Sequence, residues 1–279
     1  METLRRKNDG WTSYQVRKIA KISIRRVNQV YAEYLIKGQP PIIGRKLGRP
    51  SRPFSKEEKE LVQKTFARYN VSASTLMKLI EKDFGIHLNH NRIHRIMLEL
   101  GFAKRKINKD QRKKDWIRYE RRHSLTAVHI DWHFDAKAKR WVFAAIDDAS
   151  RKLLTLLEVE SPTVDASTRG MRVALRHGKI KQCISDHGSQ FTSNAGGNSK
   201  FKEFLDANGI QQILCKIKHP QSNGKAEKFF DLYKNKRNCF GNKSKFIHWY
   251  NEIRPHRSLN FDILETPQQA FERKMPAEA

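Results

Sequence analysis

The chain has 279 residues, and its 56 Lys and Arg against 29 Asp and Glu give a formal net charge of +27. A surplus of this size indicates a polyanionic partner, because each phosphate that is neutralised releases counterions. The sequence has no apolar run of transmembrane length and no signal-peptide core, and its three cysteines show no Cys-x-x-Cys spacing. We therefore expect a soluble, intracellular protein of two or three small domains without structural disulfides.

A helix-turn-helix is predicted over residues 1–37. Apolar residues recur at helical spacing from 16 to 34, with a break at 21–23. The second helix, roughly 24–36, has a polar side that carries Arg25, Arg26 and Asn28. Arginine suits guanine edges and phosphates, and asparagine suits adenine, so this helix is a candidate DNA reader. A plain amphipathic hairpin with a solvated polar face fits the same pattern.

Residues 38–53 form a basic linker rich in glycine and proline. Its Gly-Arg-Pro run is similar to the core of an AT-hook, in which an extended arginine, here Arg49, enters a narrow minor groove. A flexible tether is the simpler interpretation.

Residues 54–103 predict a second helix-turn-helix. Ser55 and Glu58 have the spacing of a capping box, and helices are expected near 55–69, 74–84 and 90–100. The outer face of the last helix offers Asn91, Arg92 and Arg95 as possible DNA contacts. Residues 104–123 follow as a strongly basic connector, for which a long helix crossing the DNA backbone and a disordered tether are both open.

From residue 124 to the C-terminus the pattern predicts an α/β domain with a helical extension at its end. Three short apolar strands come first and are followed by alternating helices and strands. The strands are expected at 128–134, 140–146, 153–159, 182–185 and 211–217. The helices are expected near 165–177, 200–208, 222 onward and 244–252. Such a meander feeding parallel strands brings strand ends together at one edge, where ligands gather in open α/β sheets.

Three acids stand in this domain in the order Asp, Asp, Glu. Asp131 lies in Val-His-Ile-Asp-Trp, Asp186 follows an apolar strand in Ile-Ser-Asp-His-Gly, and Glu227 lies in the first turns of a helix in Asn-Gly-Lys-Ala-Glu. Three carboxylates brought together can hold two divalent cations about 3.5–4 Å apart, a clamp suited to phosphoryl transfer. His129 and His133 share the strand face of Asp131, so a zinc site is the competing interpretation.

These segments resemble the integrase-like catalytic core of insertion-sequence transposases and retroviral integrases, the group with a DDE acid triad. The resemblance runs from roughly Ser124 to Lys274. It includes Ile-Asp-Asp-Ala-Ser-Arg at 146–151 and, near the C-terminus, Asn-Glu-Ile-Arg-Pro-His-Arg-Ser-Leu at 251–259. His187 departs from the family, which often has Asn there, and the 40 residues between Asp186 and Glu227 exceed the usual spacing.

The resemblance implies a ribonuclease H-like fold in which Asp131, Asp186 and Glu227 are both catalytic residues and ligands of two Mg²⁺ or Mn²⁺ ions. It implies cutting and joining of double-stranded DNA, both element ends and target, by a homodimer or higher oligomer in the cytoplasm of a prokaryotic cell. Phosphate contacts are expected from His219, Asn223 and Lys225, and Arg254 belongs to another basic patch that could contact DNA ends. Asp147 and Asp148 are expected to be turn acids that pair with Arg151.

Two rival functions remain open. A transposase-derived DNA-binding regulator without catalysis fits the basic N-terminal half, although intact acids argue against it. A metal-dependent nuclease acting on RNA–DNA hybrids fits the fold alone, although tandem helix-turn-helix segments favour duplex DNA. A retroviral integrase is disfavoured because the N-terminus lacks the paired His and paired Cys of that family's zinc module.

Overall fold

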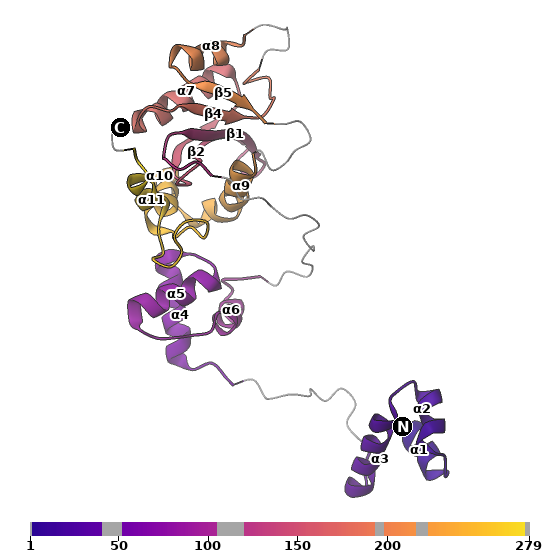
Figure 1. Ribbon diagram of the computed structural model, residues 1–279. Coiled ribbons are helices and arrows are strands. Elements are labelled where there is room, and N and C mark those ends of the chain that lie inside the picture. Colours follow the sequence, from indigo (N-terminus) through magenta and orange to yellow (C-terminus); the bar gives the residue numbers. More distant parts are fainter. Residues whose placement is uncertain (1, 41–51, 105–119, 193–197, 216–222, 277–279) are drawn as a thin grey trace. The chain divides into compact units, whose positions relative to one another are not determined.

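The computed structural model describes residues 2–40, 52–104, 120–192, 198–215 and 223–276 (Figure 1). The chain divides into two compact units, Met1–Pro53 and Phe54–Ala279. None of the helices in the described ranges is long and apolar enough to cross a membrane.

The first unit contains three helices, α1 (Glu2–Asn8), α2 (Ser13–Ala20) and α3 (Ile24–Lys37). Thr12 and Gln15 form a capping box at the start of α2, and the Ser23 side chain caps α3. Val16 and Val27 are fully buried between the helices. The predicted break at 21–23 and the helix that follows it are therefore confirmed.

The second unit begins with three helices, α4 (Lys56–Tyr69), α5 (Ala73–Phe84) and α6 (His90–Glu99). The capping box predicted for Ser55 and Glu58 is present in both directions. The apolar faces of these helices meet in a small core that includes Leu76, Ile80 and Ile93. An all-helical N-terminal region thus precedes the sheet, as the apolar spacing predicts.

A five-stranded mixed sheet in the order β3-β2-β1-β4-β5 follows. Its strands are β1 (Ala127–Asp135), β2 (Arg140–Asp147), β3 (Leu153–Val159), β4 (Gln182–Ser185) and β5 (Gln211–Leu214). The first three pair antiparallel, whereas β4 pairs parallel with both β1 and β5. The predicted meander followed by parallel strands is confirmed.

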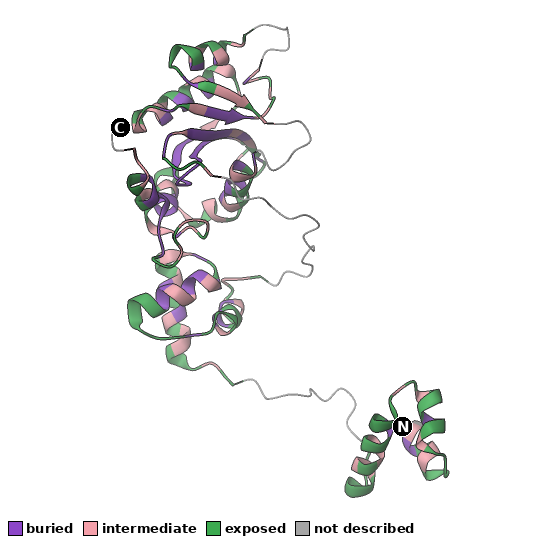
Figure 2. Cartoon of the chain, in the orientation of Figure 1, coloured by how far each residue is buried: buried purple, intermediate pink, exposed green. Residues whose placement is uncertain are grey.

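Helices cover both faces of the sheet, and most residues of β1, β2 and β4 are buried, whereas β5 at the sheet's edge has no buried residue (Figure 2). Successive side chains of β2 point to opposite faces of the sheet and so divide the core. On one face, Phe143 and Ala145 pack toward α7 (Val164–Ala174) and α8 (Lys200–Ala207). On the other face, Val142 and Ala144 pack toward α9 (Gly224–Lys236). The chain continues with η2 (Arg237–Cys239), α10 (Lys243–His248), the π-helical turn η3 (Trp249–Ile253) and α11 (Pro267–Arg273). The helix expected at 244–252 is therefore α10 with a π-helical end.

The helices α4–α6 share one apolar cluster with α9, α10 and η3. The Trp249 indole Nε1 donates a hydrogen bond to the Tyr69 carbonyl over 2.7 Å, and the Lys78 Nζ lies 2.8 Å from the Asp262 carboxylate. The Lys236 Nζ, on α9, donates a hydrogen bond to the Asn70 side-chain oxygen over 2.5 Å. These contacts make the second helical segment part of the same compact unit as the sheet.

Candidate active site

The sheet places the first two acids on neighbouring strands. His129 of β1 is opposite Ile184 of β4 in the parallel register, so two further residues bring Asp131 level with Asp186, just past the end of β4. Adjacent strands lie about 4.8 Å apart. Asp131 Oδ1 accepts a hydrogen bond from the Trp132 amide at 2.8 Å, and Asp186 Oδ1 accepts one from the Gly188 amide at 3.0 Å.

The third acid is carried by α9, which packs on β1. Its predicted apolar stripe is confirmed, because Ala226, Phe229, Phe230 and Tyr233 are all buried. The Phe230 ring contacts the His133 ring with 5.1 Å between centroids, which holds α9 against the β1 face that carries Asp131. Glu227 lies on the flank of this stripe and is exposed.

Charge interactions connect the three acids. Burial, and after it the negative charges of Asp186 and Glu227, raise the pKa of Asp131 to about 7. The pKa of the Cys215 thiol is raised to about 11 by burial and then by the same three carboxylates. Acids that are up to 96 residues apart in the sequence thus lie within interaction distance of one another.

The donor set suits a hard divalent cation, because it consists of carboxylate oxygens. Within the described ranges no three His, Cys, Asp or Glu side chains are close enough together to hold a metal ion. Neighbouring carboxylates repel one another, and the Glu227 side chain is exposed. His129 is a poor zinc ligand here, since its Nε2 is 2.7 Å from the buried Asp148 carboxylate.

A buried polar network behind the acids was not predicted. Asp148 Oδ1 accepts hydrogen bonds from His129 Nε2 and from Lys225 Nζ, and its side chain is 2% exposed. Burial opposes ionisation of Asp148, yet the His129 hydrogen bond and the Lys225 charge hold its pKa well below the ordinary value. Burial lowers the pKa of Lys225 to about 8.

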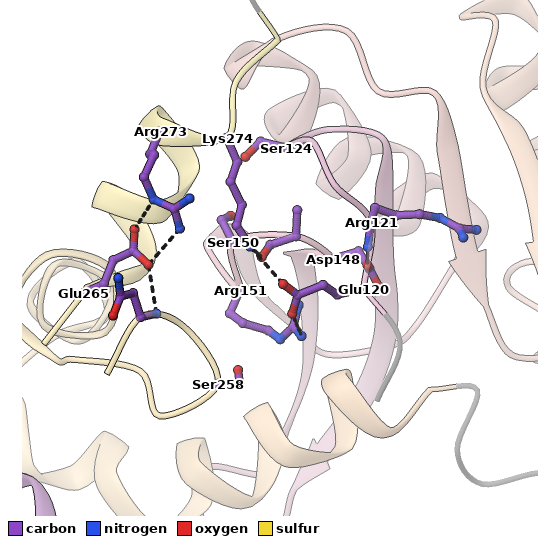
Figure 3. A network of polar contacts seen from close by, with 12 residues as sticks. Glu120, Arg121, Ser124, Asp148, Ser150, Arg151, Ser258, Glu265, Arg273 and Lys274 are labelled. Carbon is purple, nitrogen blue, oxygen red and sulfur yellow. Dashed lines mark hydrogen bonds and ion pairs between the residues drawn. The ribbon is translucent and has the colours of Figure 1, made fainter. Parts of the chain in front are cut away.

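The expected pairing of Asp147 and Asp148 with Arg151 is wrong. Asp147 closes its own turn by accepting bonds from the Ser150 amide and hydroxyl, at 2.8 and 2.6 Å. Arg151 instead donates to Glu120 over 3.0 Å (Figure 3). The sequence places the three side chains close in the chain, but the turn directs them to different partners.

The residues of the helical segments that were predicted to contact DNA differ in their exposure to solvent. Arg25, Arg26 and Asn28 are exposed on α3, and Asn91 and Arg95 are exposed on α6. Arg92 instead makes a two-pronged ion pair with Glu58, at 2.7 and 2.6 Å. Arg49 and His219 lie outside the described residues.

Three predicted DNA contacts near the acids are not on the open surface. Lys225 is paired with Asp148, and Asn223 is 9% exposed. Arg254 lies over the Tyr250 ring at 5.4 Å, burial lowers its pKa, and its Nη1 has no hydrogen-bond acceptor in the part of the chain described. A role for these residues in DNA contact stays a prediction, and it would require them to leave these positions.

Comparisons with known proteins agree with this geometry. Residues 121–220 match the family described as the integrase core domain. An insertion element IS407 uncharacterized protein of Burkholderia multivorans is 27% identical over 228 residues, which cover 72% of this chain and 76% of that protein. A putative integrase of a Spiroplasma virus is 28% identical over 152 residues, covering 46% of this chain and 41% of the relative.

Two solved structures are also similar. The catalytic core domain of BIV integrase is 15% identical with a TM-score of 0.43, covering 53% of this chain and 95% of that one. A simian T-cell lymphotropic virus intasome chain is 14% identical with a TM-score of 0.48, covering 78% and 76%. The sequence match, not these distant likenesses, identifies the α/β domain: residues 121–220 form an integrase core domain with a ribonuclease H-like fold, as the resemblance predicts.

Proposed function

We propose that this protein is a DNA transposase that cuts and joins strands at the ends of an insertion element. The observation that carries the proposal is the interaction of the buried Asp131 with the charges of Asp186 and Glu227, which together with burial raises the pKa of Asp131 to about 7. A buried acid with a strongly raised pKa beside other carboxylates is typical of functional sites. The integrase core match supports the same reaction class.

The three carboxylates would hold two divalent cations, Mg²⁺ or Mn²⁺. Bound cations of this kind supply activation of the attacking oxygen and stabilisation of the leaving oxygen in phosphoryl transfer. Asp131 and Asp186 are fixed by β1, β4 and their backbone hydrogen bonds, whereas Glu227 is adjustable on α9. Water or a 3′-hydroxyl attacks phosphate directly, so no covalent enzyme intermediate is required.

The partner would be double-stranded DNA. The exposed Arg25, Arg26 and Asn28 on α3 form a polar helix face of the kind that reads base edges. The net charge of +27 favours phosphate contact along the chain. Cutting and joining two element ends requires two active sites, so we propose a homodimer or higher oligomer on DNA.

The test is strand cleavage and joining on a labelled element-end duplex with a target plasmid. Asp131→Asn, Asp186→Asn and Glu227→Gln keep side-chain size and remove charge, and each should abolish both steps in Mg²⁺ and Mn²⁺. Asp231→Asn is the matched control: it lies one turn further along α9, is exposed, and lies 3.7 Å from Lys228. It should keep most of the activity.

The chief alternative is a DNA-binding regulator that performs no chemistry. It would be favoured by a wild-type protein that binds element ends tightly and cuts them with neither metal. Activity retained by Glu227→Gln but lost in Asp231→Asn would instead assign the third carboxylate to Asp231.

A further inference from the structure

We propose that Asp148 and Lys225 are positioning residues that fix the first turn of α9 so that Glu227 faces Asp131. The inference rests on the proposed function, and it gives Lys225 a structural role toward the cation site in place of the expected DNA contact. It starts from how β1 and α9 meet.

Three residues on one face of β1 meet three residues of α9 in the same order. His129 and Lys225 both donate hydrogen bonds to the Asp148 carboxylate. The Glu227 charge raises the pKa of Asp131. The His133 ring contacts the Phe230 ring, with 5.1 Å between their centroids. The two acids therefore lie between two contacts. The Phe230 contact lies on one side of Asp131 and Glu227 along β1 and α9, and the Asp148 contact lies on the other side.

The Asp148 contact is specific because both of its carboxylate oxygens accept hydrogen bonds from defined donors. Oδ1 accepts from His129 and Lys225, and Oδ2 accepts from the Arg121 amide at 2.6 Å. Asp148 itself is anchored through its amide, which donates to the Ala127 carbonyl at 2.9 Å. Figure 3 shows Asp148 beside Arg121, at the point where the chain enters the core. One carboxylate thus connects β1, α9 and this segment.

Burial makes the contact hard to replace. The side chains of His129, Asp148 and Lys225 are 0%, 2% and 13% exposed. An ion pair in such surroundings loses little to solvent screening, and removing one partner leaves an uncompensated charge. Lys225 precedes Glu227 by two residues in the first turn of α9, so a shift at Lys225 moves the acid directly.

A second ion pair connects β1 to the far end of α9 and provides the control. Arg237, just after α9, pairs with Asp135 at the end of β1, whose side chain is 7% exposed. This pair lies ten residues beyond Glu227, or roughly 15 Å along a helix. Asp135→Asn therefore removes an ion pair between β1 and the residue that follows α9, without touching the turn that carries Glu227.

The experiment titrates the full-length protein with Mn²⁺ and follows free Mn²⁺ by electron paramagnetic resonance, without DNA. Asp148→Asn and Lys225→Met should each raise the Mn²⁺ dissociation constant about 10- to 100-fold, the range typical of residues that orient metal ligands. Lys225→Arg should restore most of the affinity. Asp135→Asn should lower the melting temperature and leave Mn²⁺ affinity unchanged.

Three outcomes would overturn the inference. Unchanged Mn²⁺ affinity in both Asp148→Asn and Lys225→Met would do so, as would an equal loss in Asp135→Asn. Weaker DNA binding by Lys225→Met with normal Mn²⁺ affinity would return Lys225 to phosphate contact. If Asp148→Asn does not fold, Lys225→Met decides. Failure of the proposed function looks different, because wild type and Asp131→Asn would then bind Mn²⁺ equally weakly.

Discussion

Asp131 is the residue whose protonation the fold changes most clearly in the site. Its pKa in the folded chain is about 7, above an ordinary value near 4, so the folded state holds the proton more tightly than the unfolded state. By linkage, ionisation destabilises the metal-free protein as pH rises from about 4 to about 7. Above about pH 7 this destabilisation no longer changes with pH.

We therefore expect Asp131→Asn to stabilise the metal-free protein at pH 8. One pKa unit corresponds to about 1.4 kcal/mol, and because solvent screens part of the effect we expect about 1–3 kcal/mol in the free energy of unfolding. The gain should vanish below about pH 4. Urea titrations with chelator across this range measure it. An Asn variant less stable than wild type at pH 8 would contradict the assignment of repulsion to this site.

Arg25 and Arg92 were predicted to read bases in the same way, but the structure gives them different surroundings. Arg25 is exposed on α3, whereas Arg92 holds Glu58 through two hydrogen bonds and lies over the Phe54 ring at 5.0 Å. We expect Arg25→Ala to reduce discrimination between element-end and scrambled duplexes by about 1–3 kcal/mol. Arg92→Ala should instead lower the melting temperature and leave that discrimination unchanged. Competition gel shifts and thermal unfolding separate the two results.

The local positions of the three acids could be predicted from sequence, because Asp131 lies within an apolar strand, Asp186 follows one and Glu227 lies at a helix start; their catalytic role stays a prediction. The partners of Asp148 could not be predicted. Lys225 is 77 residues away in the sequence, and only the packing of α9 on β1 brings it to the carboxylate. Arg151, the near neighbour, is directed elsewhere by a left-handed backbone with φ of 65°.

At the scale of elements, the close approach of α7 to the sheet depends on one glycine. A Cβ at Gly170 would lie 2.5 Å from Cδ1 of Phe143, which is fully buried in β2. We expect Gly170→Ala to destabilise the protein by about 1–3 kcal/mol through overpacking, despite the better helix propensity of alanine. Gly241→Ala is the control, since nothing lies within 4 Å of its added Cβ. Thermal unfolding of both variants measures the difference, and equal stabilities would contradict this packing.

The elements that sequence predicted best are those with continuous apolar patterns. The bounds of β3 and β4 match the expected 153–159 and 182–185. The helix α1 was not predicted because its only buried apolar residue is Leu4, which gives no periodicity. The π-helical turn η3 also carries no local signal. It packs Trp249 and Tyr250 into the aromatic cluster with Phe246, a tertiary requirement.

At the scale of the whole molecule, the contacts join the second helical segment to the catalytic core and leave Met1–Pro53 as a separate unit. The predicted segments 54–103 and 124–279 follow one another along the sequence, but they belong to one compact unit. Energetically the two share an apolar cluster that includes Ile93 and Trp249. A fragment that ends at residue 103 would therefore expose an apolar face, so 1–53 is the better fragment to isolate.

Residues 1–53 carry 13 Lys and Arg against 3 Asp and Glu, a net charge of +10 on a small unit. We expect this fragment to bind duplex DNA by itself. Affinity should fall about 10³-fold between 50 and 200 mM salt if ~6 phosphates are contacted. Arg25→Ala together with Arg26→Ala should reduce both the affinity and the steepness of its salt dependence, because both side chains are exposed on α3. Fluorescence anisotropy with a labelled element-end duplex measures each quantity. Residues 54–279 serve as the comparison, and binding found only in that fragment would assign DNA reading to the second unit.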